Sequence, residues 1–520
     1  MSALILPLVT VFLVACLASL VLSGLVRKVA PRLGLTDCPD GHRKLHGHAM
    51  PLGGGVAIFL TLVGTVSALY FFPNPFQETL HDKLAHLPFL LAAGAVIVAV
   101  GLFDDRFGLR GRQKLAGQIV AASILILGGL QIRAIGVFGF EPFDLGLFAV
   151  PVTLFWLLGA INALNLLDGI DGLATMVGII LAFTIAVMAL LVGRVEVAVV
   201  GIAFAGSLVG FIRYNFPPAS VFLGDTGSML IGLVVGALAI QGSLKGPGTV
   251  LLAAPLAVWA IPIFDVVIAI LRRRLTGRSI YVSDHGHLHH RLLGLLGSNR
   301  KVLALVAAAC CLTSTAALLG VCLNNDLIAL LACTAVVVIF IATGLFGRIE
   351  VLLLGSRLGQ MGKSLVPSFS FKENGARETM VRLQGSGEWD VLFETLTESA
   401  DRFGLHEIHL NVSSPILRED YHASWVRANG EKDRQRRWQM ELPLLVADHP
   451  VGVLKVAGDR CEESSCSNIQ EFLDMVKPLE KELSVLSEGD VPAPVLTAGE
   501  GHASVAGHEH AAPLTRQHPK

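Results

Sequence analysis

The segment that decides the fold is AVIVAVGLFDDRFGLRGRQK, residues 95–114. An apolar run leads directly into the adjacent carboxylates Asp104 and Asp105, and a basic loop follows with Arg106, Arg110, Arg112 and Lys114. The apolar part is typical of a helix in lipid, where ionisable groups are costly and gather at the boundary with water. The segment therefore predicts a transmembrane helix whose last turn delivers two acids to a membrane surface.

The composition of the whole chain agrees with a membrane protein. Of the 520 residues, 53% are hydrophobic and only 16% are charged, and the mean hydropathy is +0.64. These values are too apolar for a typical soluble domain and indicate a polytopic membrane protein. The net charge of −1 supplies no overall field that would favour nucleic acid as a partner.

Long apolar runs fill the first 350 residues, and a helix needs about 20 residues to cross a bilayer. The predicted fold is therefore an all-α bundle of about eleven transmembrane helices, at residues 4–26, 51–72, 88–104, 115–134, 149–167, 171–192, 195–212, 227–241, 249–271, 302–323 and 326–346. The first run has no basic residue before it, and Arg27 and Lys28 follow it, so we expect a retained helix rather than a cleaved signal.

Basic residues concentrate in one set of loops, which predicts the orientation. The loops on one side of the membrane hold many basic residues: Arg27, Lys28, Arg32, Arg43, Lys44, Arg106, Arg110, Arg112, Lys114, Arg213, Arg272, Arg273, Arg274, Arg278, Arg291, Arg300 and Lys301. The loops on the other side hold only Lys83, Arg133, Arg194 and Lys245. The positive-inside bias makes the basic loops cytoplasmic, together with Asp104 and Asp105, and places the N-terminus outside. We expect an inner-membrane protein with a cytoplasmic C-terminus.

The pattern changes after about residue 350. Residues 389–404 and 467–486 have helical periodicity, whereas 406–412, 437–447 and 451–457 have the character of strands. This order predicts a cytoplasmic α+β domain over residues 375–487 that faintly resembles GAF domains. Residues 488–520 are rich in Ala, Gly, His and Pro and are predicted to be disordered.

Four polar clusters interrupt the apolar pattern on the predicted cytoplasmic face. They are the Asp104–Asp105 pair, NALNLLDGIDGLA (162–174), RYNFPPASVFLGDTGSML (213–230) and SDHGHLHHRLL (283–293). Each has a structural alternative when taken alone, because acids cap helices, basic residues set topology, and histidines bind zinc or simply face water. Their concentration on one face favours a functional site.

The residue types indicate the chemistry of that site. Carboxylate and amide oxygens suit Mg²⁺, which usually shares its coordination with substrate phosphates. Arginine, lysine and histidine side chains suit phosphate oxygens. A phosphorylated substrate with a divalent ion is therefore expected, and the membrane surface suggests that a second substrate is a lipid.

In this order, and together with DCPDGHRKLHGHAMPLGGG (37–55), the clusters resemble the polyprenyl-phosphate N-acetylhexosamine-1-phosphate transferase superfamily. The resemblance covers roughly residues 1–350. It implies transfer of a sugar-1-phosphate from a UDP-sugar to a polyprenyl phosphate. HLHHRL has Arg291 where the peptidoglycan branch has a third histidine, which favours the bacterial branch that uses UDP-GlcNAc and undecaprenyl phosphate to start O-antigen, teichoic acid or related glycans. UDP-GalNAc and UDP-MurNAc-pentapeptide remain alternative donors.

The resemblance also implies roles for individual residues. Asn165 and Asp225 match ligands of Mg²⁺, with Mn²⁺ as an alternative ion, and Asp104 with Asp105 match a catalytic pair near the lipid phosphate. The first substrate-binding positions that match are Lys114 for phosphate, Asp171 and Phe222 on the uridine side, and Asp168 without an assigned part of the substrate. The others are His287, His289, His290 and Arg291 for the diphosphate or sugar, and Lys44 with His46 as weaker matches.

Other functions and partners stay open at this stage. A transporter is disfavoured because the acids gather at one rim rather than in mid-span. A membrane sensor with an inactive enzyme core is a second alternative. A homodimer is compatible with the sequence, as is a regulatory ligand or a downstream glycosyltransferase at the C-terminal domain.

Overall fold

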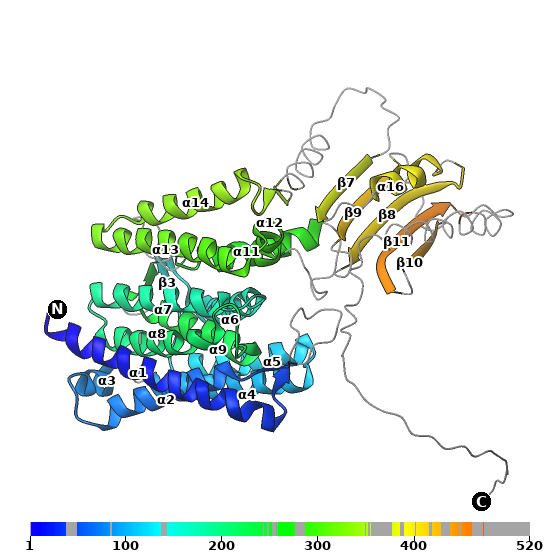
Figure 1. Ribbon diagram of the computed structural model, residues 1–520. Coiled ribbons are helices and arrows are strands. Elements are labelled where there is room, and N and C mark those ends of the chain that lie inside the picture. Colours follow the sequence, from blue (N-terminus) through cyan, green and yellow to red (C-terminus); the bar gives the residue numbers. More distant parts are fainter. Residues whose placement is uncertain are drawn as a thin grey trace, which may run out of the picture. The chain divides into compact units, whose positions relative to one another are not determined.

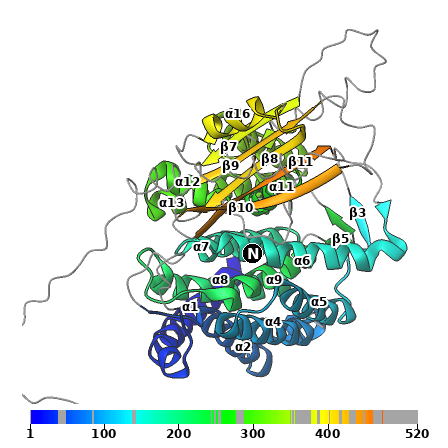
Figure 2. The same cartoon turned by 90° about the vertical axis from the view of Figure 1, so that its right-hand side faces the viewer.

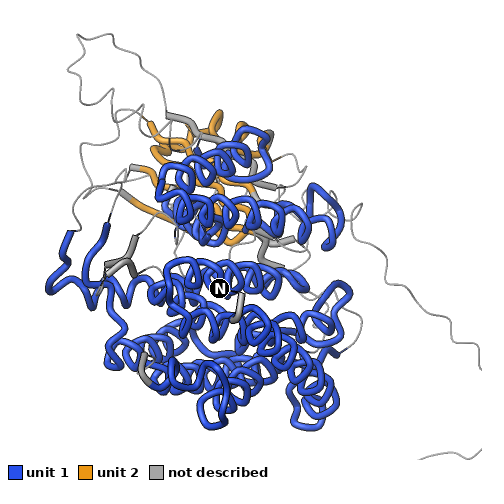
Figure 3. The backbone as a smooth tube through the Cα atoms, turned by 90° about the vertical axis from the view of Figure 1, so that its left-hand side faces the viewer, with its two compact units in different colours: residues 1–375, 381–383 blue, residues 376–380, 384–520 orange. Residues whose placement is uncertain are grey.

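The computed structural model describes residues 2–37, 49–83, 86–136, 143–242, 244–246, 249–251, 256, 258–275, 287–348, 350–351, 354, 377–384, 389–400, 402–414, 419–427, 437–446, 449–459 and 472. The chain divides into two compact units, residues 1–375 with 381–383, and residues 376–380 with 384–520 (Figure 3). Some of the predicted features lie outside the described residues: the tail at 488–520, most of the helix at 467–486, and the side chains of Lys44 and His46.

The first unit is mainly helical (Figure 1). Its α-helices are α1 (Ser2–Val29), α2 (Gly54–Phe71), α3 (Gln77–Lys83), α4 (Leu87–Phe107), α5 (Gly111–Leu127), α6 (Ala149–Leu167), α7 (Leu173–Leu191), α8 (Val195–Asn215), α9 (Gly224–Gly242), α11 (Ala260–Leu275), α12 (Leu288–Leu296), α13 (Asn299–Leu323) and α14 (Asp326–Ala342). Short 3-10 helices cover Ala30–Leu33 and Gly146–Phe148.

Within the described residues, eight helices are long and apolar enough to cross a membrane. They are α1, α2, α4, α6, α7, α8, α9 and α13. The predicted spans at 115–134, 249–271 and 326–346 correspond to shorter helices, α5 of 17 residues, α11 of 16 and α14 of 17. The multi-pass character is thus established, whereas the count of eleven stays a prediction.

Short strands also occur in this unit, so its description as all-α is incomplete. β1 (Thr36–Asp37) pairs with β2 (Met50–Pro51). A separate sheet has the order β4-β3-β6-β5, formed by β3 (Ala134–Gly136), β4 (Phe143–Asp144), β5 (Leu244–Gly246) and β6 (Thr249–Leu251). The prediction that a helix begins at residue 249 is wrong, because glycine and proline precede β-branched Thr249 and Val250 and favour extended backbone there.

Helix α9 lies at the centre of the unit and carries Asp225 in its first turn. It packs against α2, α4, α6 and α7 (Figures 1 and 2). In its most apolar stretch 89% of α9 is buried, whereas the corresponding value for α1 is 22%. Helix α1 therefore lies at the periphery, and α9 is the element against which the others are positioned.

Close backbone contacts bring two helices up to the first turn of α9. Gly101 of α4 faces the backbone of Thr226, and Gly55 of α2 faces that of Gly227. A Cβ atom at either glycine would overlap these backbone atoms. Small residues of this kind let helices approach closely in lipid, where dispersion packing rather than the hydrophobic effect drives association. The packing places the end of α4 directly beside the start of α9.

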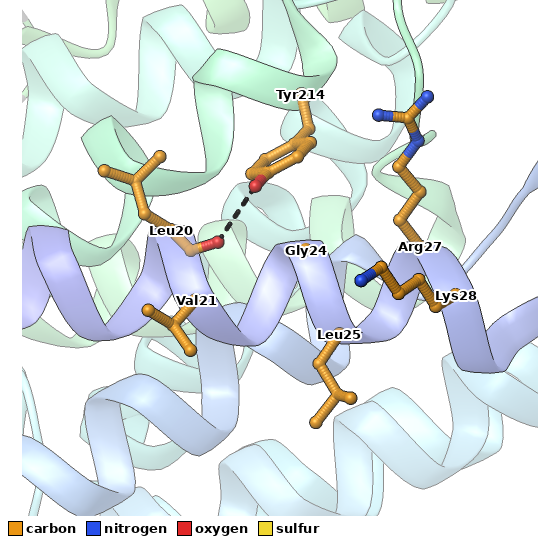
Figure 4. A pocket seen from close by; sticks show the side chains of 7 residues that line it. All are labelled: Leu20, Val21, Gly24, Leu25, Arg27, Lys28 and Tyr214. Atoms are coloured by element: carbon orange, nitrogen blue, oxygen red, sulfur yellow. Dashed lines mark hydrogen bonds between the residues drawn. The ribbon is translucent and has the colours of Figure 1, made fainter.

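Helix α1 is held against α8 at its basic end. The hydroxyl of Tyr214 donates a hydrogen bond to the carbonyl of Leu20 at 3.2 Å, and Gly24 leaves room for the tyrosine ring (Figure 4). A surface pocket here is lined by these residues and by Val21, Leu25, Arg27 and Lys28. The pocket contains none of the predicted site residues, and its cations are those of the last turn of α1.

The second unit contains a five-stranded sheet of order β10-β11-β8-β9-β7, apart from residues 381–383 of β7. Its elements are β7 (Arg377–Gln384), α16 (Trp389–Glu398), β8 (Leu405–Ser414), β9 (Glu419–Val426), β10 (Arg437–Val446) and β11 (His449–Asp459). The three predicted strands are observed as β8, β10 and β11, whereas β7 and β9 were not predicted. Trp389, Phe393 and Leu396 of α16 are buried in the core of this unit.

Candidate active site

Three helix ends meet around the carboxylate of Asp225. Asp104 and Asp105 come from the last turn of α4, Asn165 from the last turn of α6, and Asp225 from the first turn of α9. The Asn165 amide donates hydrogen bonds to Asp225 Oδ1 and, at 3.0 Å, to Ser228 Oγ. The two side chains predicted as metal ligands are therefore in direct contact.

Lys114, in the first turn of α5, joins this cluster as its cation. Its Nζ donates to Asp225 Oδ2 at 2.9 Å and forms an ion pair with Asp104 Oδ2. Burial alone would lower the pKa of Lys114, but the carboxylates of Asp225 and Asp104 outweigh it and raise that pKa. The lysine therefore stays an ammonium ion at neutral pH, placed between the carboxylates of Asp225 and Asp104.

The two adjacent acids of α4 have different contacts. Asp104 is only 8% exposed, and its Oδ1 accepts the backbone N–H of Leu109 at 2.7 Å where the helix ends. Its Oδ2 faces Lys114. Asp104 thus closes its own helix and points a carboxylate oxygen into the cluster.

Asp105 instead holds the start of another helix. Its Oδ1 accepts the backbone N–H of Asp225 at 2.8 Å. Its Oδ2 accepts the backbone N–H of Thr226 at 3.2 Å and the Thr226 hydroxyl at 2.6 Å. The first N–H groups of a helix have no partner within the helix, so Asp105 acts as an N-cap supplied by α4 to α9. Gly224 is required beside it, because a Cβ there would lie 2.6 Å from Asp105 Oδ2.

Asp168 follows directly after α6 and lies half-buried among other acids. Burial, with the nearby charges of Asp225, Asp105 and Asp171, raises the pKa of Asp168 well above its usual range. The accumulation of carboxylates around one lysine leaves excess negative charge at the site, which favours a bound cation.

The donor set fits Mg²⁺ in its chemistry. Carboxylate and amide oxygens of Asp225 and Asn165 are hard ligands, and Mg²⁺ is commonly held by one or two side chains plus substrate phosphates. Within the part of the chain that the structure describes, no three His, Cys, Asp or Glu residues form a ready-made metal cage. The ligand types of Asp225 and Asn165 are compatible with Mg²⁺.

Asp171 and Phe222 were predicted to contact uridine. Asp171 Oδ2 accepts the backbone N–H of Ala219 at 3.0 Å, which ties the α6–α7 loop to the α8–α9 loop. The backbone N–H of Phe222 donates to the carbonyl of Pro51 at 2.9 Å, and its own carbonyl accepts the N–H of Gly54. Both residues thus join loops at this end of the bundle, and their contact with uridine stays a prediction.

Of the predicted histidine segment, residues 283–286 lie outside the described residues, and His287 with the residues after it forms the start of α12, which reaches the α6–α7 loop. The ring of His289 is 2% exposed, and it packs so closely on Gly169 that a Cβ there would overlap Nε2. Burial and the neighbouring His290 and His287 lower the pKa of His289 well below its usual range, so the ring is neutral. Neither ring nitrogen of His289 has a hydrogen-bond partner among the described residues.

The other members of this segment lie alongside. His290 packs against His289 with ring centroids 4.3 Å apart. Burial lowers the pKa of Arg291, and Glu350 partly offsets this. Glu350 itself accepts a hydrogen bond from Arg272 Nε at 2.6 Å in a fully buried pair that sequence reasoning did not find.

Asp265 is the principal residue that the sequence analysis missed. It lies in α11, is fully buried, and has both carboxylate oxygens directed at the start of α12. The available signal was a single acid inside the apolar stretch AIPIFDVVIAI (260–270). An ionisable residue within a predicted span is a functional candidate by default.

Comparison with known proteins shows the family of the chain. A family model described as glycosyl transferase family 4 matches residues 87–243, which include the ends of α4, α6 and the start of α9. The chain is 35% identical over 293 residues to a probable undecaprenyl-phosphate N-acetylglucosaminyl 1-phosphate transferase of Bacillus subtilis, covering 56% of this chain and 79% of that protein.

Two further relatives match an equal share of the chain. The decaprenyl-phosphate N-acetylglucosaminephosphotransferase of Mycobacterium tuberculosis is 34% identical over 320 residues, covering 56% of this chain and 78% of the relative. The undecaprenyl-phosphate alpha-N-acetylglucosaminyl 1-phosphate transferase of Escherichia coli K12 is 29% identical over 301 residues, with 56% and 78% covered.

The helical unit and the polar cluster at its helix ends, taken with these matches, define a multi-pass membrane transferase. The chain belongs to glycosyl transferase family 4, the polyprenyl-phosphate N-acetylhexosamine-1-phosphate transferase superfamily, and to its bacterial branch. The resemblance found in the sequence is thereby confirmed.

Proposed function

We propose that the protein transfers N-acetylglucosamine-1-phosphate from UDP-GlcNAc to undecaprenyl phosphate, which yields undecaprenyl-diphospho-GlcNAc and UMP. The product would start a cell-surface glycan. The observation that carries the proposal is the contact of Lys114 and Asn165 with Asp225, beside Asp104. This cluster combines a cation for phosphate with oxygen ligands for a metal ion. The three relatives bear names that specify N-acetylglucosamine, which supports this donor.

Charge repulsion is the central obstacle to this reaction, because an anionic lipid phosphate must attack an anionic diphosphate. Asn165 and Asp225 would hold Mg²⁺, which when bound neutralises diphosphate charge. Lys114 adds a fixed positive charge beside both acids, and preorganised charge of this kind stabilises the transition state. Asp104 orients the lipid phosphate, which is already largely dianionic at neutral pH because its second pKa is near 6.

The remaining residues position these groups. Asp105 holds the N-terminus of α9 and hence Asp225. The neutral ring of His289, with His287, His290 and Arg291, would close over the diphosphate or the sugar. Asp171 and Phe222 would contribute on the uridine side.

The location and orientation follow from the same proposal. The last turns of α1 and α11 carry Arg27, Lys28 and Arg272–Arg274. These basic ends favour the cytoplasmic side of an inner membrane for the site, with the N-terminus outside. Soluble UDP-sugar and lipid phosphate can meet only at such a surface.

A transfer assay with the purified full chain in nanodiscs tests the proposal. Radiolabelled UDP-GlcNAc, undecaprenyl phosphate and MgCl₂ should give labelled lipid and UMP, and EDTA should stop the reaction. UDP-GalNAc and UDP-MurNAc-pentapeptide serve as competing donors at equal concentration. Faster transfer from either would replace the proposed donor, and no transfer from any of the three would favour a non-catalytic sensor.

Substitution at the centre provides the second part of the test. Asp104→Asn and Asp225→Asn should each abolish most transfer. Glu196→Gln is a matched control, because Glu196 is also a buried carboxylate but lies in the first turn of α8, near Arg194. Full activity in either of the first two variants would remove that residue from the proposed mechanism.

A further inference from the structure

We propose that Asp265 is a positioning residue for this transfer, which fixes both the first turn of α12 and the ring of His287. The link of Asp265 to catalysis rests on the proposed function, whereas its anchoring of α12 does not. Asp265 does not belong to any of the four polar clusters in the sequence, and among the described residues its polar contacts are with the start of α12.

The burial of Asp265 requires partners. The residue has no exposed surface and lies within the apolar helix α11. An acid in such a position is costly unless it is paired or hydrogen-bonded. The backbone N–H of Leu288 donates to Asp265 Oδ1 at 2.8 Å, and His287 Nδ1 lies 3.3 Å from Oδ2. Both partners belong to the start of α12.

The contact with Leu288 anchors α12. This helix has only nine residues, and the side chain of its N-cap residue, His287, makes no capping hydrogen bond. Isolated helices of this length are unstable in water. A carboxylate at the N-terminus satisfies a free N–H and interacts favourably with the helix dipole. Asp265 therefore supplies from α11 the cap that α12 does not supply itself.

The contact with His287 fixes the imidazole. His287 Nδ1 and Asp265 Oδ2 are both buried and lie 3.3 Å apart, and neither atom meets hydrogen-bond geometry with any of the described residues. A carboxylate oxygen only accepts, so the pair is satisfied when Nδ1 carries the proton. That leaves Nε2 as the nitrogen available to a ligand, which is how carboxylates orient histidines in many sites.

The same anchor governs the neighbouring histidine. The rings of His287 and His289 are parallel within 3°, with centroids 6.0 Å apart. His289 packs on Gly169 in the loop that carries Asp168. A tilt of α12 would therefore move both rings relative to the acids of the site, and Asp265 would act on the reaction by this route.

Two variants separate the two contacts. Asp265→Asn keeps an oxygen for the Leu288 N–H but presents an NH₂ group to His287, which moves the ring proton to Nε2. Asp265→Ala removes both contacts. We expect Asp265→Asn to lose about 10- to 100-fold in kcat, in the range typical for loss of an orienting partner. Glu196→Gln again controls for loss of a buried carboxylate.

A double-mutant cycle with His287→Gln distinguishes positioning from general destabilisation. If Asp265 acts through His287, Asp265→Asn will cost little more in the His287→Gln background, because the group that it orients is already gone. A purely structural role predicts that the two losses multiply. Multiplying losses, or full activity of Asp265→Asn, would overturn the assignment to His287.

Hydrogen exchange tests the anchor without any reaction. In the full-length protein, Asp265→Ala should raise amide exchange in residues 288–296, whereas Asp265→Asn should leave it near the wild-type rate. Unchanged exchange in Asp265→Ala would overturn the anchoring role. If the wild-type chain transfers no sugar but exchange rises as expected, the proposed function fails and the anchoring role stands.

Discussion

Asp105 and Thr226 are joined by two hydrogen bonds, from the threonine N–H at 3.2 Å and from its hydroxyl at 2.6 Å, both to Asp105 Oδ2. With the N–H of Asp225 on Oδ1, the carboxylate of Asp105 is engaged by the first turn of α9. The neighbouring Asp104 faces Lys114 instead. Two adjacent acids that look alike in the sequence thus have separate tasks.

Substitution of each acid in turn should reveal this division. Asp105→Ala, which removes the capping carboxylate, should lower the stability of the protein by about 0.5–2 kcal/mol, the usual cost of a lost cap, and reduce transfer only in part. Asp104→Asn should lose transfer with a much smaller change in stability. Initial rates and thermal unfolding of both purified variants provide the measurement. Equal loss of transfer without destabilisation in both would instead support a joint catalytic pair.

Lys114 should remain charged throughout the physiological range. Its pKa is raised from 10.5 by Asp225 and Asp104 against the opposing effect of burial. A base with a raised folded pKa contributes stability that is fully present below the unfolded pKa and is lost as pH rises through the folded value. The stability difference between wild type and Lys114→Met should therefore be constant from about pH 7 to 10 and shrink above that.

The measurement for Lys114 is thermal unfolding across this pH series, together with transfer rates. Lys114→Met should lose transfer by about 100-fold or more, as for removal of a preorganised charge. Lys114→Arg, which keeps the charge, is the matched control and should retain more activity. A stability difference that disappears between pH 7 and 9 would contradict the raised pKa.

Ionisation of Asp168 should lower the stability of the folded state. Burial and three neighbouring acids raise its pKa well above 3.8. Because the folded state then binds the proton more tightly than the unfolded state, stability is lost as pH rises from about the unfolded value towards the folded one. In EDTA at neutral pH, Asp168→Asn should therefore unfold at a higher temperature than wild type, and the difference should vanish near pH 3. A less stable variant at neutral pH would refute this.

Gly169 should tolerate no side chain, because a Cβ would overlap the buried ring of His289. Gly169→Ala should displace α12 and reduce transfer by about 100-fold, as expected when reacting groups move by about 1 Å. Gly159→Ala is the control, since no atom lies within 4 Å of a Cβ at that position of α6. The measurement is the steady-state transfer rate of both variants. Equal rates would contradict the packing of the His289 ring on Gly169.

Much of the fold was accessible from the sequence. The apolar runs predicted the helices that later form the bundle, because the length of hydrocarbon to be crossed imposes a long uniform signal. The strand patterns near 406, 437 and 451 were likewise visible as apolar segments. Residue 249 was misassigned, since a short strand and a helix start look alike inside an apolar run.

For the candidate site, the sequence by itself determined which chemical groups gather at one end of the bundle, because each stands beside an apolar run whose end is set by the membrane. Only the tertiary structure decided what each group contacts. Asp105 reaches Thr226 across 121 residues and Asp265 reaches Leu288 across 23. Such hydrogen bonds depend on how closely the helices pack, and no local pattern in the sequence encodes the distance between two packed helices.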